Sequence, residues 1–194
     1  MKRFGVSHIS IMVVIALIII FFACQTQQQS QMTGQTPVER GEYLVTLGGC
    51  NHCHTPKVFS EHGMALDTTR LLSGYPHDLT LPEIDLGLVA PGKWILFNQD
   101  LTAAAGPWGV SFSANLTPDE NTGIGLWTEE LFIETFRTGK HLGKGRPILP
   151  PMPWEDIGLS TDEDLKSMFA YLKSLKPIQN QVPQPIPMKE LMAK

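Results

Sequence analysis

One segment of five residues, Cys50-Asn51-His52-Cys53-His54, constrains this 194-residue chain more than any other feature. Two cysteines separated by two residues and followed directly by a histidine form the covalent attachment signal for c-type haem. The sulfurs of Cys50 and Cys53 would add to the two vinyl groups of the porphyrin, and a tight helical turn sets the reach between them. His54 follows at once, which directs its imidazole at the iron. The motif predicts a domain folded around one covalently bound haem c, with His54 as an iron ligand.

Other uses of a cysteine pair fit the sequence less well. A thioredoxin-like pair needs a βαβ context, and no strand pattern precedes Cys50. A structural zinc site needs four ligands, and the nearest histidines downstream, His62 and His77, stand at a spacing that fits no standard pattern. A disulfide between Cys50 and Cys53 would leave His54 unexplained. We therefore expect haem rather than zinc or thiol redox chemistry.

The second axial ligand of the iron must come from elsewhere in the chain. The candidates are Met64, Met152, Met168, Met188, His62, His77 and His141. Met152 stands between Pro151 and Pro153, in a loop that can hold a thioether in place with little entropy left to lose. We predict Met152, with His141 or an open site as the alternatives. A His/Met pair leaves no exchangeable position and raises the reduction potential, which favours electron transfer over oxygen activation.

The N-terminal residues 1–23 are typical of an export signal. Lys2 and Arg3 precede thirteen unbroken apolar residues, Ile11–Ala23. That is the length of a signal-peptide h-region and is short of a full membrane span. The positive flank places the N-terminus in the cytoplasm and the rest of the chain outside. We therefore expect an exported, periplasmic or extracytoplasmic protein, in keeping with haem attachment outside the cytoplasm.

Cys24 directly follows the apolar run, after a small residue. This arrangement resembles the lipobox of bacterial lipoproteins, in which the cysteine sulfur carries a diacylglyceryl group and the cysteine becomes the new N-terminus. Two acyl chains give stable membrane anchoring, where one does not. We favour lipidation at Cys24 over a retained helix or simple cleavage. Residues 24–36 then form a flexible tether, because they lack charge and have little apolar content.

Residues 37–178 are expected to form the haem domain. Capping and periodicity predict a helix from Pro37 to Gly48 and a second helix from Thr128 to Thr138. A third helix follows Ser160, which begins a capping box completed by Glu163. Its apolar positions recur with helical spacing. The only regular elements predicted with a clear pattern are therefore helices, and the expected fold class is all-α.

Two segments lack such patterns. Residues 56–112 are rich in proline, glycine and short apolar pieces, and we expect a loop-rich insertion with at most one short hairpin around Trp94–Leu101. Such a long insertion would shape one side of the haem pocket or a docking surface. Residues 179–194 are proline-rich, and we expect an extended tail that lies over the surface or is disordered.

Several residues have weaker claims to a role. Three tryptophans would wall the haem pocket or simply pack in the core: Trp108, Trp127 and Trp154. Three basic residues would pair with haem propionates or remain solvated: Arg137, Lys140 and Arg146. Three polar residues would bind calcium or form a plain turn: Asp119, Glu120 and Asn121.

Over residues 37–182, the chain resembles class I c-type cytochromes. Gly41 and Leu44 in the first helix, the attachment motif, Met152 and Tyr171-Leu172 in the last helix carry this resemblance. It implies a fold of few helices around one haem, in which the first and last helices cross at a small residue. Longer runs are similar to the haem units in cytochrome subunits of membrane-bound bacterial dehydrogenases: GEYLVTLGGCNHCHTP, GPWGVSFSANLTPD, TGIGLWTEELFIETFRTGK, GRPILPPMPW and DLKSMFAYLKSLKP. Those subunits usually carry three haem motifs, and this chain has one.

These features predict a membrane-tethered extracytoplasmic cytochrome that transfers single electrons and is not itself an enzyme. Its partners would be redox proteins, namely a dehydrogenase, another cytochrome or a terminal oxidase. One alternative is the electron-accepting subunit of a periplasmic dehydrogenase complex, and another is a haem enzyme or gas sensor with an open iron site. A net charge of −4 offers no basic excess to neutralise phosphates, so nucleic acid is not an expected partner.

Overall fold

The computed structural model describes residues 34–193. The expected export signal (residues 1–23) and the expected lipidation site, Cys24, lie outside the described residues. Within the described range, none of the helices combines the length and the apolar character that crossing a bilayer requires.

The helices predicted from capping and periodicity are present. In chain order, the helices are α2 (Pro37–Leu47), α3 (Cys50–His54), α4 (Glu129–Thr138), α5 (Trp154–Ile157), α6 (Asp162–Ser174) and α7 (Met188–Leu191). There are also two 3-10 turns among these residues: Thr68–Arg70 follows strand β2 (Gly63–Leu66), and His141–Gly143 lies between α4 and α5. Helix α4 begins where Thr128 accepts a hydrogen bond from the Leu131 amide.

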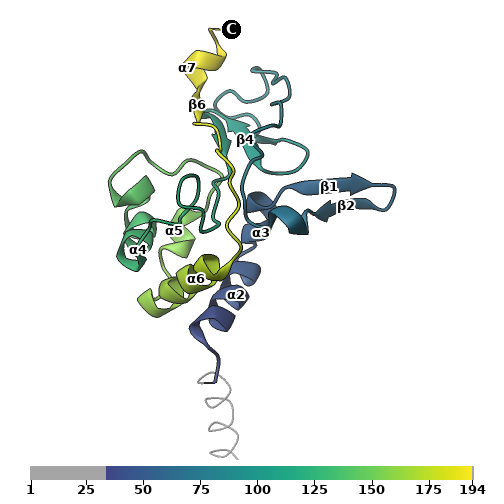
Figure 1. Ribbon diagram of the computed structural model, residues 1–194. Coiled ribbons are helices and arrows are strands. Elements are labelled where there is room, and N and C mark those ends of the chain that lie inside the picture. The colour runs from purple at the N-terminus through teal and green to yellow at the C-terminus, as the bar shows by residue number, and fades with distance from the viewer. Residues whose placement is uncertain (1–33, 194) are drawn as a thin grey trace, which may run out of the picture. The chain divides into compact units, whose positions relative to one another are not determined.

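Helices α2 and α6 cross in close contact, as the resemblance implied (Figure 1). A Cβ atom at Gly41 would lie 1.9 Å from the backbone oxygen of Ser167, so only glycine fits at this crossing. Arg40 and Asp164 form an ion pair across it at 2.9 Å. The main hydrophobic core is built on this crossing, where buried side chains such as Val45 and Leu165 pack together.

The cap of α6 differs from the predicted one by one residue. Thr161, not Ser160, is the N-cap, because its side chain accepts a hydrogen bond from the Asp164 amide. The predicted capping box of Ser160 and Glu163 was wrong in register. Serine and threonine are both ordinary N-cap residues, so the local sequence alone does not choose between Ser160 and Thr161.

The expected all-α fold class was wrong. Among residues 34–193 the structure has two antiparallel sheets beside its helices and is mixed α/β. The first is the hairpin β1 (Lys57–Ser60) and β2 (Gly63–Leu66). The second has the order β3-β4-β5-β6, with β3 (Leu96–Phe97), β4 (Ala103–Gly106), β5 (Gly109–Phe112) and β6 (Ile186–Pro187).

The physical reason for this error lies in the strands themselves. They contain two to four residues each, too few to show an alternating pattern. Strand β4 reads Ala-Ala-Ala-Gly and is buried at all four positions. It therefore has neither the β-branched residues nor the polar face that mark most strands. A hairpin does occur near the expected one, but it pairs Leu96 with Ala105.

The C-terminal segment packs against the domain rather than standing apart from it. Asn180 is buried, and its side-chain amide donates to the backbone oxygens of Ser73 and Tyr75 at 2.7 and 2.9 Å. Six residues later β6 pairs with β5, where Gly109 has a φ of 108° and has no room for a side chain. Figure 1 shows this yellow segment running from α6 to β6.

Candidate haem site

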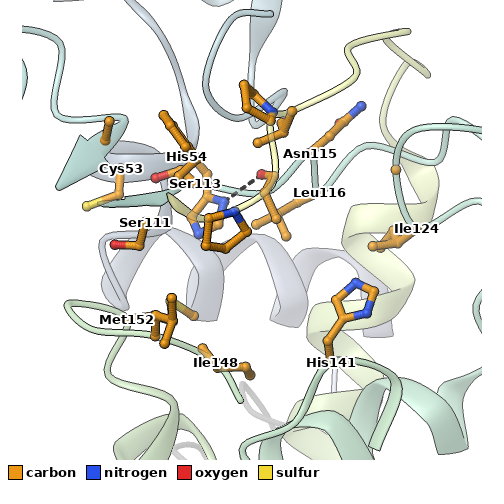
Figure 2. Close-up of a pocket in the computed structure, with 18 of the residues that line it drawn as sticks. Cys53, His54, Ser111, Ser113, Asn115, Leu116, Ile124, His141, Ile148 and Met152 are labelled. Carbon is orange, nitrogen blue, oxygen red and sulfur yellow. Dashed lines mark hydrogen bonds between the residues drawn. The ribbon is translucent and has the colours of Figure 1, made fainter. Parts of the chain in front are cut away.

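A cavity of about 380 Å³ brings together the elements that carry the predicted site residues (Figure 2). Its walls come from α3, from strands β4 and β5, from α4 and from the loop that ends at Pro153. Its volume lies within the range of ordinary ligand pockets, and its lining is mainly apolar with a few polar groups. His54, Cys53 and Met152 all line it.

His54 lies at the C-terminal end of α3 and is only 7% exposed. Its Nδ1 is 2.8 Å from the backbone oxygen of Ala114. Since a carbonyl only accepts, Nδ1 carries the proton, which leaves the lone pair of Nε2 free to bind a metal. Burial lowers the pKa of His54, and the hydrogen bond to Ala114 only partly offsets it. The neutral imidazole, which is the form that binds metals, is therefore favoured.

The two cysteines of the motif lie on one helical turn of α3, half-buried and not joined by a disulfide. Cys53 lines the cavity, and Cys50 packs against the main hydrophobic core. Burial raises the pKa of both thiols. A redox-active cysteine pair needs the opposite shift, because the thiolate is the reactive form. The thioredoxin-like alternative therefore finds no support here.

Met152 approaches the cavity from a different wall than His54 (Figure 2). Its loop is tied to the sheet by Ser111, whose hydroxyl donates to the backbone oxygen of Pro150 at 2.6 Å. The half-buried thioether is thus held by a proline-rich loop that is itself anchored to β5. Sequence reasoning missed Ser111, because nothing in the local pattern links it to residue 150.

Only two of the seven candidate second ligands, all within the described residues, line the cavity. These are Met152 and His141. The His141 ring packs edge-on against Trp127, with centroids 5.5 Å apart, and burial lowers its pKa. The other candidates are placed elsewhere: His62 and Met64 in the β1-β2 hairpin, His77 against Asn180, Met168 in the core and Met188 in α7.

The basic residues and tryptophans that were weaker candidates for the pocket differ in whether they line the cavity. Arg137 is occupied at the start of α6, where it pairs with Asp162 and bonds to the Ser160 oxygen. Arg146, in contrast, lines the cavity. Of the tryptophans, Trp127 lines it as well.

The Asp119 carboxylate accepts from the backbone amides of Asn121 and Thr122, so these residues form a turn. This carboxylate also accepts from the Thr122 hydroxyl. Between residues 34 and 193, no group of three or more His, Cys, Asp or Glu side chains is placed to hold a metal ion. This finding supports neither the calcium site nor the zinc alternative.

The C-terminal segment also contributes a wall that the sequence did not indicate. Residues 181–185 line the cavity directly after buried Asn180. Their composition, with two prolines and two glutamines, resembles that of a solvated tail. The donor set and the mainly apolar walls together fit a haem: the Cys53 thiol, the oriented neutral His54 imidazole and the Met152 thioether line one cavity, and Cys50 lies on the same helical turn as Cys53.

Comparison with known proteins agrees with this chemistry. No protein-family model matches the chain. It is 27% identical over 177 residues to the fructose dehydrogenase cytochrome subunit of Gluconobacter japonicus, which covers 87% of this chain and 29% of that protein. It is 28% identical to the gluconate 2-dehydrogenase cytochrome c subunit of Pantoea cypripedii, covering 78% of the chain and 27% of the relative.

A third relative is the cytochrome c subunit of the quinone alcohol dehydrogenase of Gluconobacter oxydans. It is 28% identical over 79% of the chain and 25% of its own length. The chain thus spans less than a third of each of these relatives. Its homologues are cytochrome subunits of dehydrogenases, at modest identity over most of the chain.

Proposed function

We propose that this homologue of dehydrogenase cytochrome subunits is an electron carrier that holds one haem c, attached through Cys50 and Cys53. His54 and Met152 would bind its iron. One observation carries the proposal: Met152 lines the same cavity as Cys53 and His54, although it lies far from them in the chain. When bound, a haem supplies one-electron chemistry by cycling its iron between the ferrous and ferric states.

The chain's own residues would set the conditions for that chemistry. The Ala114 oxygen orients His54 and keeps its proton on Nδ1, so that Nε2 faces the ligand position. The loop of Met152, bonded to Ser111, holds a soft thioether that favours the ferrous state. The mainly apolar walls would exclude water from the bound group. If His54 and Met152 both bound the iron, no position would be left there for a substrate, as expected for an electron carrier.

The test is an optical spectrum of the oxidised protein and of Met152→Ala. The wild type should show the weak long-wavelength charge-transfer band of a methionine bound to ferric iron, and the band should disappear in the variant. Met64→Ala is the matched control, because Met64 is exposed in the β1-β2 hairpin and should leave the band unchanged. A band that persists in Met152→Ala would exclude Met152 as the ligand. Carbon monoxide binding by the reduced wild type at neutral pH would support the rival class, a haem enzyme or gas sensor.

A second candidate function is the electron-accepting subunit of a dehydrogenase complex. The printed names of the relatives favour it, since each is a subunit of a dehydrogenase. Copurification of the tagged chain with a flavin, quinone or molybdenum enzyme would support this candidate. Recovery of the chain alone, or with another cytochrome or a terminal oxidase, would favour a free carrier.

We further propose that the protein works at the extracytoplasmic face of a membrane. Residues 1–23 have the composition of an export signal, and Cys24 stands where a lipid-modified cysteine would. Residues 24–36 would then tether the haem domain to the membrane surface. Haem attachment outside the cytoplasm requires the same export.

A further inference from the structure

Lys57 is a buried lysine next to the attachment motif that the proposed function leaves unused. It begins β1 shortly after His54, and only 7% of its surface is exposed. Its ammonium group donates to the backbone oxygens of His52 at 2.8 Å, Asp100 at 3.0 Å and Thr55. An ammonium group has three N–H donors, so all of them are used. Lys57 is therefore held against the carbonyl groups at the C-terminal end of α3.

No carboxylate neutralises this charge at close range. In the part of the chain that the structure describes, no ion pair includes Lys57. The nearby Asp100 carboxylate instead accepts hydrogen bonds from the side chains of Asn98 and Thr102. Burial lowers the pKa of Lys57, and the Asp100 charge opposes that shift from a distance. The ammonium is thus held by three backbone carbonyl oxygens, with the Asp100 carboxylate nearby but not paired with it.

This charge reaches the residues that would hold the haem. The Lys57 ammonium group donates to the backbone oxygens of His52 and Thr55, which flank Cys53 and His54 in the chain. A nearby positive charge disfavours the ferric state, which carries one more positive charge than the ferrous state. A unit charge ~12 Å from a redox centre, at an effective dielectric constant of ~20, changes a one-electron equilibrium about tenfold. That corresponds to ~59 mV.

We propose that Lys57 raises the reduction potential of the haem by holding an unpaired positive charge behind the attachment helix α3. The proposal rests on the proposed function, because it requires a haem attached to this helix. Asp100 acts in the opposite direction, since its carboxylate partly offsets the charge. Lys57 is thus a residue that tunes the cofactor without touching the iron.

Redox titration of the purified haem-loaded protein, followed by its absorption spectrum, tests this role. Lys57→Met removes the charge but keeps most of the side-chain volume. The equilibrium constant for reduction of the haem should fall about tenfold, which lowers the reduction potential by ~59 mV. Lys57→Arg keeps the charge and should stay within about twofold of the wild type, as should Lys93→Met, the matched change of an exposed lysine. The fall should persist in 1 M salt, where exposed charges are screened within ~3 Å but buried charges are screened much less.

Three results would overturn the proposal. An unchanged potential in Lys57→Met would do so, and so would an equal fall in Lys57→Arg, which would indicate a packing effect. If Lys57→Met does not fold, Lys57→Gln also removes the charge but keeps N–H donors for the backbone oxygens: the potential should fall, and no fall contradicts the proposal.

Haem content, measured by pyridine haemochrome spectra of the same samples, separates this proposal from the proposed function. A wild type without covalent haem would overturn the proposed function. Haem-loaded samples with equal potentials would overturn only the role of Lys57.

Discussion

The side chain of Asn180 fixes a whole segment whose composition predicts none of its contacts. It joins the C-terminal segment to residues more than 100 positions earlier, through bonds to the oxygens of Ser73 and Tyr75. Its Oδ1 also accepts from the His77 amide at 3.0 Å. The next residues, 181–185, line the cavity. This amide group is therefore one of the contacts that hold a wall of the site in place, together with the bond from the Asn180 backbone amide to the Thr122 hydroxyl.

Asn180→Ala should lower the free energy of unfolding by about 2–4 kcal/mol, because it leaves buried backbone groups without partners, at ~1–3 kcal/mol each. Denaturant unfolding of the haem-loaded protein measures this change. Gln179→Ala is the matched control, since Gln179 is the exposed neighbour and its truncation should change stability by less than about 0.5 kcal/mol. Equal stability of the two variants would show that the C-terminal segment is held by other contacts.

At the scale of secondary-structure elements, helices were predictable and strands were not. Helices α4 and α6 can be predicted from local sequence, because each has a capping threonine, acidic residues in the first turn and apolar residues at helical spacing. Strands β3 to β6 are short, and β6 pairs with a strand more than 70 residues earlier. Their stability comes from that pairing and from burial. Neither the pairing nor the burial can be predicted from the residues next to each strand.

The start of α6 offers a sharp test at this scale. Thr161→Ala should destabilise the protein by about 1 kcal/mol, because the Asp164 amide loses its acceptor at the N-cap. Ser160→Ala should be close to neutral, because the Ser160 contact with Arg137 uses the backbone oxygen. Urea denaturation of both variants decides the matter. A larger loss in Ser160→Ala than in Thr161→Ala would restore Ser160 as the cap.

At the scale of the whole molecule, the proposed membrane tether depends on Cys24. We expect mass spectrometry of the mature protein to find Cys24 as the first residue, carrying acyl chains, after removal of residues 1–23. Cys24→Ala should retain Met1, because the modified cysteine is needed for that processing. Gln25→Ala is the control and should be processed like the wild type. An intact Met1 in the wild type would contradict lipidation at a new N-terminus and favour a retained helix.

The amino-acid sequence by itself determined the features that depend on neighbouring residues. The haem motif occupies one helical turn, and the long helices follow from caps and periodicity within a few residues. The sequence also singled out Met152 as the expected second ligand, because it stands between two prolines, with His141 or an open site as the alternatives.

Only the tertiary structure decided the rest, because it depends on contacts between distant residues. It showed that Met152 and His141 line the cavity and that the other candidate ligands lie elsewhere. It paired His54 with an oxygen 60 residues away and built a sheet where loops were expected. It also buried Lys57 against three carbonyl groups, one of them 43 residues away. Such contacts between distant residues produce no periodic pattern in the sequence, so they are seen only in the folded structure.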